Sequence, residues 1–414
     1  MYLVPYFPTP IRTRPYNFIR ALARRGNQVS LFTVWEKKED LEYLSLYQDE
    51  GVETHAIHLS RSQIVINLTQ SILKGIPLQA SYSWVPRLRS EINAKISMSS
   101  FDVIHIEHLR GAQYGLAIQA SEGNAANQPG IPMVVDLVDC ISNLFQLASS
   151  DSKSSLVKAM ASFELPRTRK YEARLLDKFR SIVISSANDR QALFQNYALV
   201  RDKLLPADLQ ITILPNGVDM DYFHPNGSEA QQNHVVFSGK LSYHANVTAA
   251  LELVNEVMPR IWDKKPQVIV TLVGKDPPRK IRELTTKDSR IQVTGTVNDI
   301  RPYLQQATLA IIPIKYGAGI QNKVLEAMAC GAPVVASKQA ITAMENIQPG
   351  EDILVGNNIE EIAHLSLALL NDRALQNKYR KNGYRYVHKW HNWGIAAQQL
   401  EKIYSAEINR SSIN

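Results

Sequence analysis

Cysteine is scarce in this sequence. Only Cys140 and Cys330 occur among 414 residues, far apart and without neighbouring cysteine or histidine clusters. This scarcity argues against a disulfide framework and against a structural zinc site, because both need several closely spaced ligands. A catalytic thiol is the alternative at either position, but burial as a small apolar residue is the more usual role of an isolated cysteine.

Long hydrophobic runs are also missing. No apolar stretch reaches the roughly 20 residues that a membrane-spanning helix requires. The opening residues 1–8 carry no basic leader and are too short for the core of a signal peptide, so we interpret them as a first strand. No repeat or low-complexity tract is evident. These absences predict a cytoplasmic protein, and the length favours two domains.

Positive charge exceeds negative charge, with 46 Lys and Arg against 39 Asp and Glu, a net charge of +7. Such a balance suits binding of phosphates, nucleic acid or an anionic membrane surface, and a merely basic soluble protein is the alternative. No zinc-finger spacing or aromatic-interleaved RNA motif occurs, which disfavours nucleic acid. Two local clusters of basic residues stand out, Arg12, Arg14, Arg20, Arg24 and Arg25, and Arg167, Arg169, Lys170, Arg174, Lys178 and Arg180.

Short apolar runs alternate with helical patterns along nearly the whole chain, which predicts strand–helix units and parallel sheets. The expected strands of the first half are 2–7, 28–34, 52–59, 103–107, 132–138, 181–185 and 211–214. Those of the second half are 234–238, 267–273, 291–294, 309–314, 333–336 and 353–355. The main expected helices are 16–25, 155–179, 245–262, 300–306, 322–330, 359–370 and 375–388.

A turn-rich segment, Pro215-Asn216-Gly217, separates two α/β halves of similar size and is followed by the polar run 226–233. Open parallel sheets bind ligands at the carboxyl ends of their strands. We therefore look for function in the loops that follow strands, and expect a cleft between two facing sheets.

The most informative segment runs from Leu309 to Ala336. A buried strand enters a loop with Gly317 and Gly319, a short helix follows, and Gly331 ends that helix. Glycines allow close approach of a ligand to the backbone, and the free N–H groups of a helix start attract anions. This arrangement predicts a diphosphate site that needs no metal, with Lys323 in the first helical turn as an added positive charge.

Glu326 lies one turn beyond Lys323, where its carboxylate can accept hydrogen bonds from the two hydroxyls of a ribose. The alternative is that the glycines only form a tight turn and Glu326 faces water. A dinucleotide fingerprint would require a third glycine, but Asn322 occupies that position, so a nicotinamide-dependent enzyme is disfavoured.

The segment from Gly319 to Val335 resembles the donor-site signature of retaining GT-B glycosyltransferases of family 4, in particular bacterial sugar transferases of exopolysaccharide assembly. Leu214–Pro225 is similar to the interdomain loop of that family. Phe237–Asn246 resembles the loop that opens its second domain, and Gly295–Tyr303 the segment under the nucleobase. The first half matches only in pattern.

The resemblance implies two Rossmann-like doubly wound domains. Residues 1–208 would form the acceptor-side domain, completed by a crossover helix at about 390–414, and residues 209–389 would bind the nucleotide-sugar. Glu326 would hold the ribose, and the backbone of Gly319, Ile320, Gln321 and Asn322 the diphosphate. Lys240 and Lys323 would act on the leaving phosphate. Many relatives carry a glutamate where this chain has Ala318, which leaves the donor sugar open.

Candidate residues of the first half follow strands. In the segment Asp102–His108, Glu107 or His108 would contact acceptor or phosphate, and core or surface packing is the alternative that we favour. Asp139, after the next strand, would line the sugar pocket. Arg12 and Arg14 follow the first strand and suit phosphate, because a guanidinium binds two oxygens at once. Solvated charge is the competing interpretation.

The carboxylates of Asp219 and Asp221 resemble a metal-binding pair, but they belong to the interdomain loop and a structural role is favoured; we predict no metal and no cofactor.

The expected activity is transfer of a sugar to a glycan or a lipid-linked acceptor in polysaccharide or glycoconjugate biosynthesis. The alternatives are a nucleotide-sugar epimerase of the same fold and a non-catalytic binding subunit. The basic clusters add the hypothesis of a peripheral contact with the inner face of a membrane.

Overall fold

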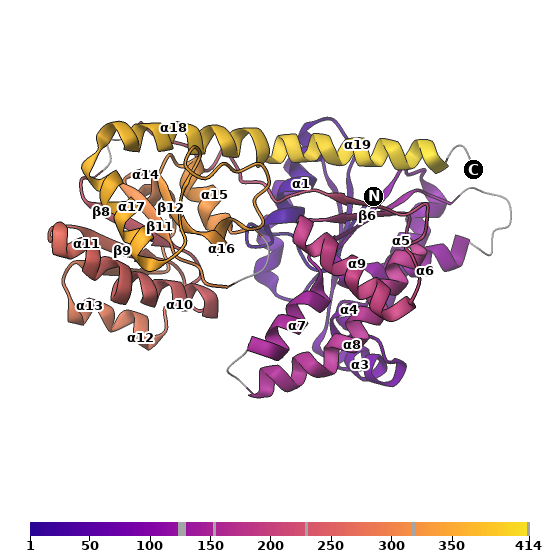
Figure 1. Ribbon diagram of the computed structural model, residues 1–414. Helices are drawn as coiled ribbons and strands as arrows, with labels where there is room; N and C mark the ends of the chain where they lie inside the picture. Colours follow the sequence, from indigo (N-terminus) through magenta and orange to yellow (C-terminus); the bar gives the residue numbers. More distant parts are fainter. Residues whose placement is uncertain (123–129, 152–154, 228–230, 317–319, 412–414) are drawn as a thin grey trace. The chain divides into compact units, whose positions relative to one another are not determined.

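The computed structural model describes residues 1–122, 130–151, 155–227, 231–316 and 320–411. Figure 1 shows a chain of α/β elements that divides into two compact units. Unit 1 comprises Met1–Pro215 and Ala396–Asn414, and unit 2 comprises Asn216–Ile395. Each unit contains one parallel sheet with its own buried core.

Unit 1 has a seven-stranded parallel sheet in the order β3-β2-β1-β4-β5-β6-β7. Its strands are β1 (Tyr2–Val4), β2 (Ser30–Trp35), β3 (Glu53–His58), β4 (Ile104–Glu107), β5 (Met133–Val138), β6 (Ser181–Ile184) and β7 (Gln210–Ile213). Its helices include α1 (Thr13–Arg24), η1 (Lys38–Tyr43), α2 (Leu44–Asp49), α3 (Arg61–Lys74), α4 (Leu78–Tyr82), α5 (Pro86–Met98), α6 (His108–Glu122), α7 (Ile141–Asp151), α8 (Ser155–Lys178) and α9 (Ala187–Arg201).

Unit 2 has a six-stranded parallel sheet in the order β10-β9-β8-β11-β12-β13. Its strands are β8 (His234–Ser238), β9 (Ile269–Val273), β10 (Ile291–Gly295), β11 (Leu309–Ile312), β12 (Val334–Ser337) and β13 (Leu354–Gly356). Helices connect them: α10 (His244–Glu252), η2 (Leu253–Val257), α11 (Met258–Lys264), α12 (Arg279–Arg282), α13 (Leu284–Lys287), α14 (Arg301–Gln305), α15 (Asn322–Ala329), α16 (Lys338–Ile341), α17 (Ile359–Asn371) and α18 (Arg373–Trp390).

The strand order places a topological switch point in each sheet. The order of strands reverses between β1 and β4 in unit 1, and between β8 and β11 in unit 2. Connections on either side of such a point leave in opposite directions, which opens a crevice beyond the carboxyl ends of the two strands. The loops after β1 and β4, and after β8 and β11, are therefore the places where each unit can bind a ligand.

The expected strands are all present in the described chain, with boundaries that differ by a few residues. Two differences have a clear cause. β1 stops at Val4 instead of residue 7 because Pro5 and Pro8 have no N–H to donate to a sheet, and β11 stops at Ile312 because Pro313 follows. The expectation that both cysteines are buried is confirmed.

The last helix, α19 (Trp393–Ser411), belongs to unit 1 from Ala396 onward. Its attachment is polar as well as apolar, because Glu401 forms an ion pair of 2.7 Å with Arg25. The hydroxyl of Tyr404 lies 2.9 Å from Nδ1 of His105 in β4. Across the described helices, none combines the length and apolar character needed to cross a membrane.

Candidate functional site

Two glycine turns lie back to back at the carboxyl end of the unit 2 sheet. Gly239 follows β8 with φ of 147°, and Gly274 follows β9 with φ of 156°. A Cβ atom on Gly274 would stand 1.7 Å from the carbonyl oxygen of Gly239, well inside van der Waals contact. The two turns can approach this closely only because residue 274 has no side chain.

The start of α15 lies against the first of these turns. A Cβ atom on Gly239 would be 3.2 Å from Cε of Lys323, so the Lys323 side chain passes directly over the glycine. Lys323 is buried apart from a small exposed fraction, and its ammonium donates to Oε1 of Gln321 at 2.8 Å. The first N–H groups of a helix have no partner within the helix, so α15 presents donors and an ammonium at the β8/β11 switch point.

Glu326 follows Lys323 by one helical turn and is half-buried. Burial raises the pKa of Glu326 to about 6, although the charge of Lys323 opposes the rise. Burial lowers the pKa of Lys323 to about 8, and here Glu326 opposes the fall. At neutral pH the pair is therefore an ammonium beside a carboxylate, one suited to phosphate and the other to hydroxyl groups.

The other expected donor-site residues lie around this turn. Lys240 is exposed directly after Gly239, and half-buried Ile320 and Gln321 precede α15. Oδ1 of Asn322 is buried and lacks a hydrogen-bond partner in the described structure. Gly319 and Ala318 lie outside the described residues.

Asn246 was not among the residues singled out from the sequence. Its Nδ2 donates to the carbonyl of Lys240 at 3.0 Å and stands 2.9 Å from where a Cβ of Gly239 would be. It therefore holds the turn that Lys323 covers. The helix that carries it was expected, but asparagine at its position gives no local signal of this contact.

A buried polar network occupies the switch point of unit 1. Arg14 reaches across from α1 to Asp136 at the end of β5, with Nη2 2.7 Å from Oδ2. It also donates to the carbonyl of Leu214 at 2.9 Å. The hydroxyl of Tyr2 donates to Glu107 at 3.2 Å. Charged groups buried in this way are held by one another.

Burial in this network fits the packing role that the sequence favoured for Glu107, and it places Arg14 in the same network. The side chain of Glu107 is fully buried and that of Arg14 is only 4% exposed. Their polar ends contact one another's neighbours, with Arg14 bonded to Asp136 and Glu107 accepting from Tyr2. Burial raises the pKa of Glu107 to about 7, opposed by the charge of Arg14.

Arg12, His108 and Arg110 form the more accessible rim of the same switch point. Arg12 is exposed, with its guanidinium over the ring of Tyr6 at 4.6 Å. His108 has φ of 64° and its Nδ1 accepts from the N–H of Arg110 at 3.2 Å. Burial, with the nearby arginines, lowers the pKa of His108 to about 3, so the ring is neutral.

Arg110 is a residue that the sequence interpretation missed. Its Nε is buried and has no hydrogen-bond partner in the described structure, and its guanidinium stands over Tyr82 at 5.3 Å. Burial and the charge of Arg12 lower the pKa of Arg110. Two guanidinium groups that repel each other at a strand end are suited to an anionic ligand. No motif marks Arg110, because this role depends on the loop after β1.

Asp139 follows β5 on the same edge of the sheet. Its Oδ1 accepts from the hydroxyl of Ser185 at 3.1 Å, and the side chain is half-buried. Burial, together with the neighbouring Asp189, raises the pKa of Asp139 to about 6. The preceding residue, Val138, has φ of 67°, which is a strained conformation for a β-branched residue and is often found at functional sites.

One buried group has the composition of a metal site. His105, Glu107 and Asp136 each offer one ligand atom, and these atoms lie within 4.8 Å of one another. The guanidinium of Arg14 already contacts Asp136, and the hydroxyl of Tyr404 faces His105. We interpret the group as part of the polar core, because its charge is balanced by arginine.

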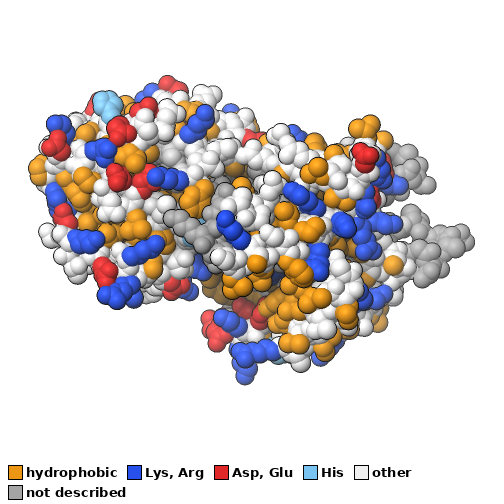
Figure 2. Space-filling model, turned by 60° about the horizontal axis from the view of Figure 1, so that its bottom comes forward, with side chains coloured by type: hydrophobic (Ala, Val, Ile, Leu, Met, Phe, Trp, Pro, Cys, Tyr) orange, Lys and Arg blue, Asp and Glu red, His pale blue; other side chains and the backbone are white. Residues whose placement is uncertain are grey.

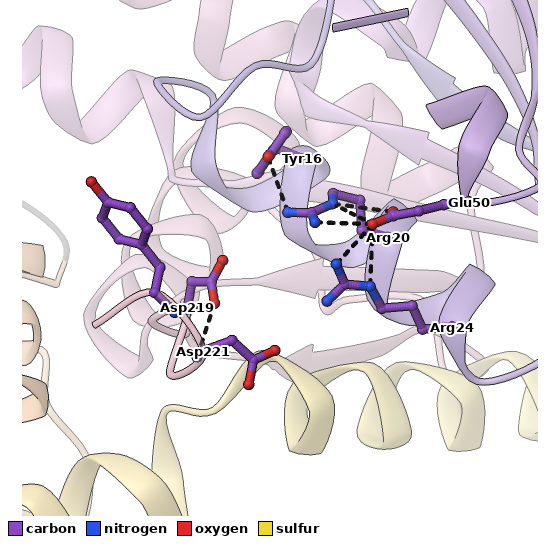
Figure 3. Close-up of polar contacts among 7 residues, drawn as sticks. Tyr16, Arg20, Arg24, Glu50, Asp219 and Asp221 are labelled. Atoms are coloured by element: carbon purple, nitrogen blue, oxygen red, sulfur yellow. Dashed lines mark hydrogen bonds and ion pairs between the residues drawn. The ribbon is translucent and has the colours of Figure 1, made fainter. Parts of the chain in front are cut away.

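Most arginines of the basic cluster at α1 form ion pairs within unit 1. Figure 3 shows Arg20 and Arg24 both directed at Glu50, with Arg20 also bonded to the hydroxyl of Tyr16. Arg25 is paired with Glu401. Of the five arginines expected as an anion surface, Arg12 is the one left facing the rim.

The Asp219 and Asp221 pair forms a turn. Oδ1 of Asp219 accepts from the N–H groups of Asp221 and Tyr222, each at 3.1 Å (Figure 3). A side chain that closes its own loop in this way is an Asx turn. The geometry fits the structural role that the sequence favoured.

Solved structures of similar fold cover almost the whole chain. A sucrose-phosphate synthase from Thermosynechococcus elongatus aligns over 98% of both chains with a TM-score of 0.65 and 17% identity. The Anabaena protein Alr3699/HepE, solved with UDP and glucose, aligns over 98% of both chains with a TM-score of 0.61 and 15% identity. A glycosyltransferase from Rickettsia africae has a TM-score of 0.61 at 14% identity, over 98% of this chain and 97% of that chain.

These similarities identify the fold as GT-B, with its two parallel-sheet α/β units. No curated protein sequence matches the chain significantly. Two family descriptions do match: "Glycosyl transferases group 1" over residues 232–372, and "Glycosyltransferase Family 4" over residues 12–222, more than half of the chain. The chain therefore belongs to glycosyltransferase family 4, and its activity is the transfer of a sugar.

Proposed function

We propose that this glycosyltransferase takes its sugar from a nucleoside diphosphate-sugar bound at the β8/β11 switch point of unit 2. The observation that carries the proposal is the placement of Lys323 over Gly239, with Glu326 one turn further along α15. The structure of Alr3699/HepE contains UDP and glucose, which supports a UDP-sugar as the first donor to test.

The donor would be held by complementary charge. The N–H groups at the start of α15, with Gly319, Ile320, Gln321 and Asn322, would bind the diphosphate. Glu326 would accept hydrogen bonds from the two ribose hydroxyls, which are charge-assisted because the carboxylate is ionised at neutral pH. Lys323 and exposed Lys240 would face the phosphate that departs.

The acceptor would be bound by unit 1, at the β1/β4 switch point. Arg12, His108 and Arg110 line this rim, and Asp139 lies beyond the neighbouring strand. Two arginines and a neutral imidazole suit an acceptor that carries phosphate or carboxylate, such as an acidic glycan or a lipid-linked sugar. The pathway would then be polysaccharide or glycoconjugate biosynthesis.

The reaction would proceed with retention at the anomeric carbon. The bond between that carbon and the β-phosphate oxygen breaks, a bond to the acceptor oxygen forms on the same face, and the acceptor proton passes to the departing phosphate oxygen. Lys323, Lys240 and the start of α15 stabilise the negative charge that develops on that oxygen. These fixed positive groups supply what a divalent ion would otherwise supply, so we propose a metal-independent transfer.

A thermal-shift screen with UDP, GDP and ADP and their glucose conjugates tests the donor site. A ligand that binds the folded protein raises its midpoint of unfolding by mass action. We expect one nucleotide series to raise the midpoint, and Glu326→Gln to reduce the rise. Glu351→Gln is the matched control, because Glu351 is an exposed glutamate of the same unit, paired with Lys378.

Product analysis then separates the three activities weighed from the sequence. Release of the nucleotide supports transfer, and addition of EDTA should leave its rate unchanged. Conversion of the donor to an isomer would indicate an epimerase instead. Binding without any turnover would indicate a non-catalytic subunit, and no shift with any nucleotide would contradict the donor site itself.

A further inference from the structure

A cavity of about 320 Å³ lies in unit 1 between α3, α4, α6 and α8. This volume is within the range of small-molecule binding sites. None of the residues proposed above as donor or acceptor contacts lines it. The cavity is therefore a second concave site of unit 1, in addition to the rim at the β1/β4 switch point.

Two cations stand at this cavity. Lys74 in α3 and Arg174 in α8 both line it, and both are exposed. Neither has an ion-pair partner among the residues that the structure describes. Burial raises the pKa of the Tyr171 hydroxyl and the charge of Arg174 opposes the rise, so these two groups are close in space. Two cations without internal partners are complementary to a carboxylate or a phosphate.

Tyr171 contributes a buried hydroxyl that the fold leaves unsatisfied. Its side chain lines the cavity and is 4% exposed, and the hydroxyl has no hydrogen-bond partner in the described part of the chain. A buried polar group without a partner is destabilising, so each one in a native fold requires an explanation. An oxygen atom of a ligand in the cavity supplies the missing partner.

The rest of the lining combines an aromatic ring with amides. Trp84 packs on Tyr114, with ring centroids 4.7 Å apart. Nε2 of Gln113 donates to Oγ of Ser81 at 2.7 Å, and Gln70 is exposed at the cavity. The C–H face of a sugar ring packs on aromatic side chains, and its hydroxyls both donate to amides and accept from them. This lining therefore suits a saccharide better than a bare inorganic anion.

The surface around the cavity is basic. Residues 61–85, which include α3 and α4, contain no aspartate or glutamate. In α8, Glu164 and Glu172 are buried, and Asp177 is paired with Arg201. Figure 2, in which the lower side of Figure 1 is turned forward, shows more blue than red side chains over unit 1. This face therefore attracts an acidic ligand and repels a cationic one.

The cavity adjoins the acceptor rim through α4 and α6. Gln113 follows Arg110 by one helical turn, about 5 Å along the axis of α6. The guanidinium of Arg110 stands over the ring of Tyr82 at 5.3 Å, and Ser81, the preceding residue of α4, lines the cavity. Neighbouring units of one glycan chain can therefore occupy the rim and the cavity together.

We propose that this cavity binds an acidic sugar unit, whose carboxylate or phosphate is held by Lys74 and Arg174 and whose ring packs against Trp84. The hydroxyl of Tyr171 bonds to an oxygen of the same unit. The acceptor is then an anionic glycan that extends from the rim into the cavity, and this part rests on the acceptor site proposed for the β1/β4 switch point.

Calorimetric titration of the full chain, without nucleotide, tests the cavity. The probes are galacturonate, galactose 6-phosphate and galactose, which share a ring and differ in the acid group. We expect at least one acidic sugar to bind about tenfold or more tightly than galactose, because its hydrogen bonds to the cations are charge-assisted. No binding of either acidic sugar would overturn the proposal, as would equally tight binding of inorganic phosphate, which has no ring.

Lys74→Ala/Arg174→Ala should abolish the preference for the acidic sugar. The matched control is Arg61→Ala/Lys158→Ala, which removes one exposed cation from each of α3 and α8 and leaves the cavity lining intact. The control should bind acidic sugars like the unmodified chain. Equal binding by the two double variants would contradict the cavity as the site, because net charge alone would then attract the sugar.

Tyr171→Phe separates a contact with the ligand from a role in the fold. The variant loses a hydroxyl that bonds to no described group, so thermal stability without ligand should stay the same or rise. Affinity for the acidic sugar should fall by about fivefold or more with loss of the hydrogen bond. A fall in stability with unchanged affinity would show that the hydroxyl serves the fold and binds no sugar.

Digalacturonate tests the extension toward the rim. It should bind about tenfold or more tightly than galacturonate when its two units occupy both sites. Arg12→Ala should remove this gain and leave galacturonate binding unchanged. A gain that persists in Arg12→Ala would overturn the extension into the rim, whereas loss of all sugar binding would overturn the cavity site. Failure of the donor proposal would abolish only the nucleotide thermal shift, since these titrations contain no nucleotide.

Discussion

The two switch points of this protein use charge in opposite ways. At β1/β4, Arg14 and Asp136 are buried and neutralise each other. At β8/β11, the carboxylate of Glu326 is half-buried and accepts no hydrogen bond from the described residues. The first arrangement pairs its charges internally, whereas the second leaves the carboxylate without such a partner, as the proposed donor site requires. Charge at a strand end therefore indicates function only where the fold leaves it unsatisfied.

The largest effect should follow from breaking the buried pair. Asp136→Ala leaves the Arg14 guanidinium buried without its partner, and we expect the free energy of unfolding to fall by about 3–5 kcal/mol. Urea denaturation measures this change. The double variant Arg14→Met/Asp136→Leu removes both charges and should recover much of the loss. A cost close to zero for Asp136→Ala would remove the contrast between the two switch points.

Glu326→Gln should show the opposite pattern to Asp136→Ala, with weaker nucleotide binding and nearly unchanged stability. In the proposed role the carboxylate binds the ligand and does not support the fold, so stability should change little. Affinity for the nucleoside diphosphate should fall about tenfold or more with loss of a charge-assisted hydrogen bond. Calorimetric titration gives the affinity and urea denaturation the stability. The comparison fails if the variant unfolds readily and still binds nucleotide as before.

The affinity for the donor should depend on pH through the ionisation of both Glu326 and Lys323. As pH rises through about 6, Glu326 ionises and affinity should increase. As pH rises through about 8, Lys323 loses its proton and affinity should decrease. Calorimetric titrations between about pH 5 and about pH 9 should therefore show a plateau of affinity between the two pKa values. Lys323→Met should remove the upper limb alone, and a profile with neither limb would contradict the assignment.

The smallest effect should come from the surface pairs of α1. Arg24 is half exposed and shares Glu50 with Arg20, which keeps its own bidentate contact when Arg24 is removed (Figure 3). Arg24→Ala should therefore cost at most about 1 kcal/mol in thermal or urea unfolding, and less at high salt. A loss of unfolding free energy as large as that for Asp136→Ala would contradict this prediction. It would mean that the exposed pair of Arg24 matters as much for stability as the buried pair of Arg14.

Much of the fold follows from local sequence. Periodicity and turn residues located the strands of both sheets, because a strand buried on both faces is a short apolar run with breakers at its ends. The ends were less accurate where proline intervened, as at Pro5 and Pro313. Lys323 and Glu326 could also be proposed from local sequence, because they follow a strand and a glycine-containing loop. Their helix start lies within one continuous motif, whereas the placement of Lys323 over Gly239 depends on a contact between distant segments.

The exposure of the candidate residues in unit 1 could not be predicted from local sequence in this way. Arg12 and Arg14 are two residues apart, yet one is exposed and the other is buried against Asp136, which is 122 positions away. Arg110 acquires its place beside Arg12 only when β4 lies next to β1. Glu107 is removed from the surface by the same pairing. Such exposure depends on contacts between distant segments, which no local pattern records.

The sequence by itself determined two parallel α/β halves, a helix start that carries Lys323 and Glu326, and an overall positive charge. The tertiary structure decided which charges are available. Packing neutralises Arg14, Arg20 and Arg25, and leaves Arg12 exposed. The physical reason is that a charge is stabilised by whichever partner lies nearest in space, and only the folded chain brings those partners together.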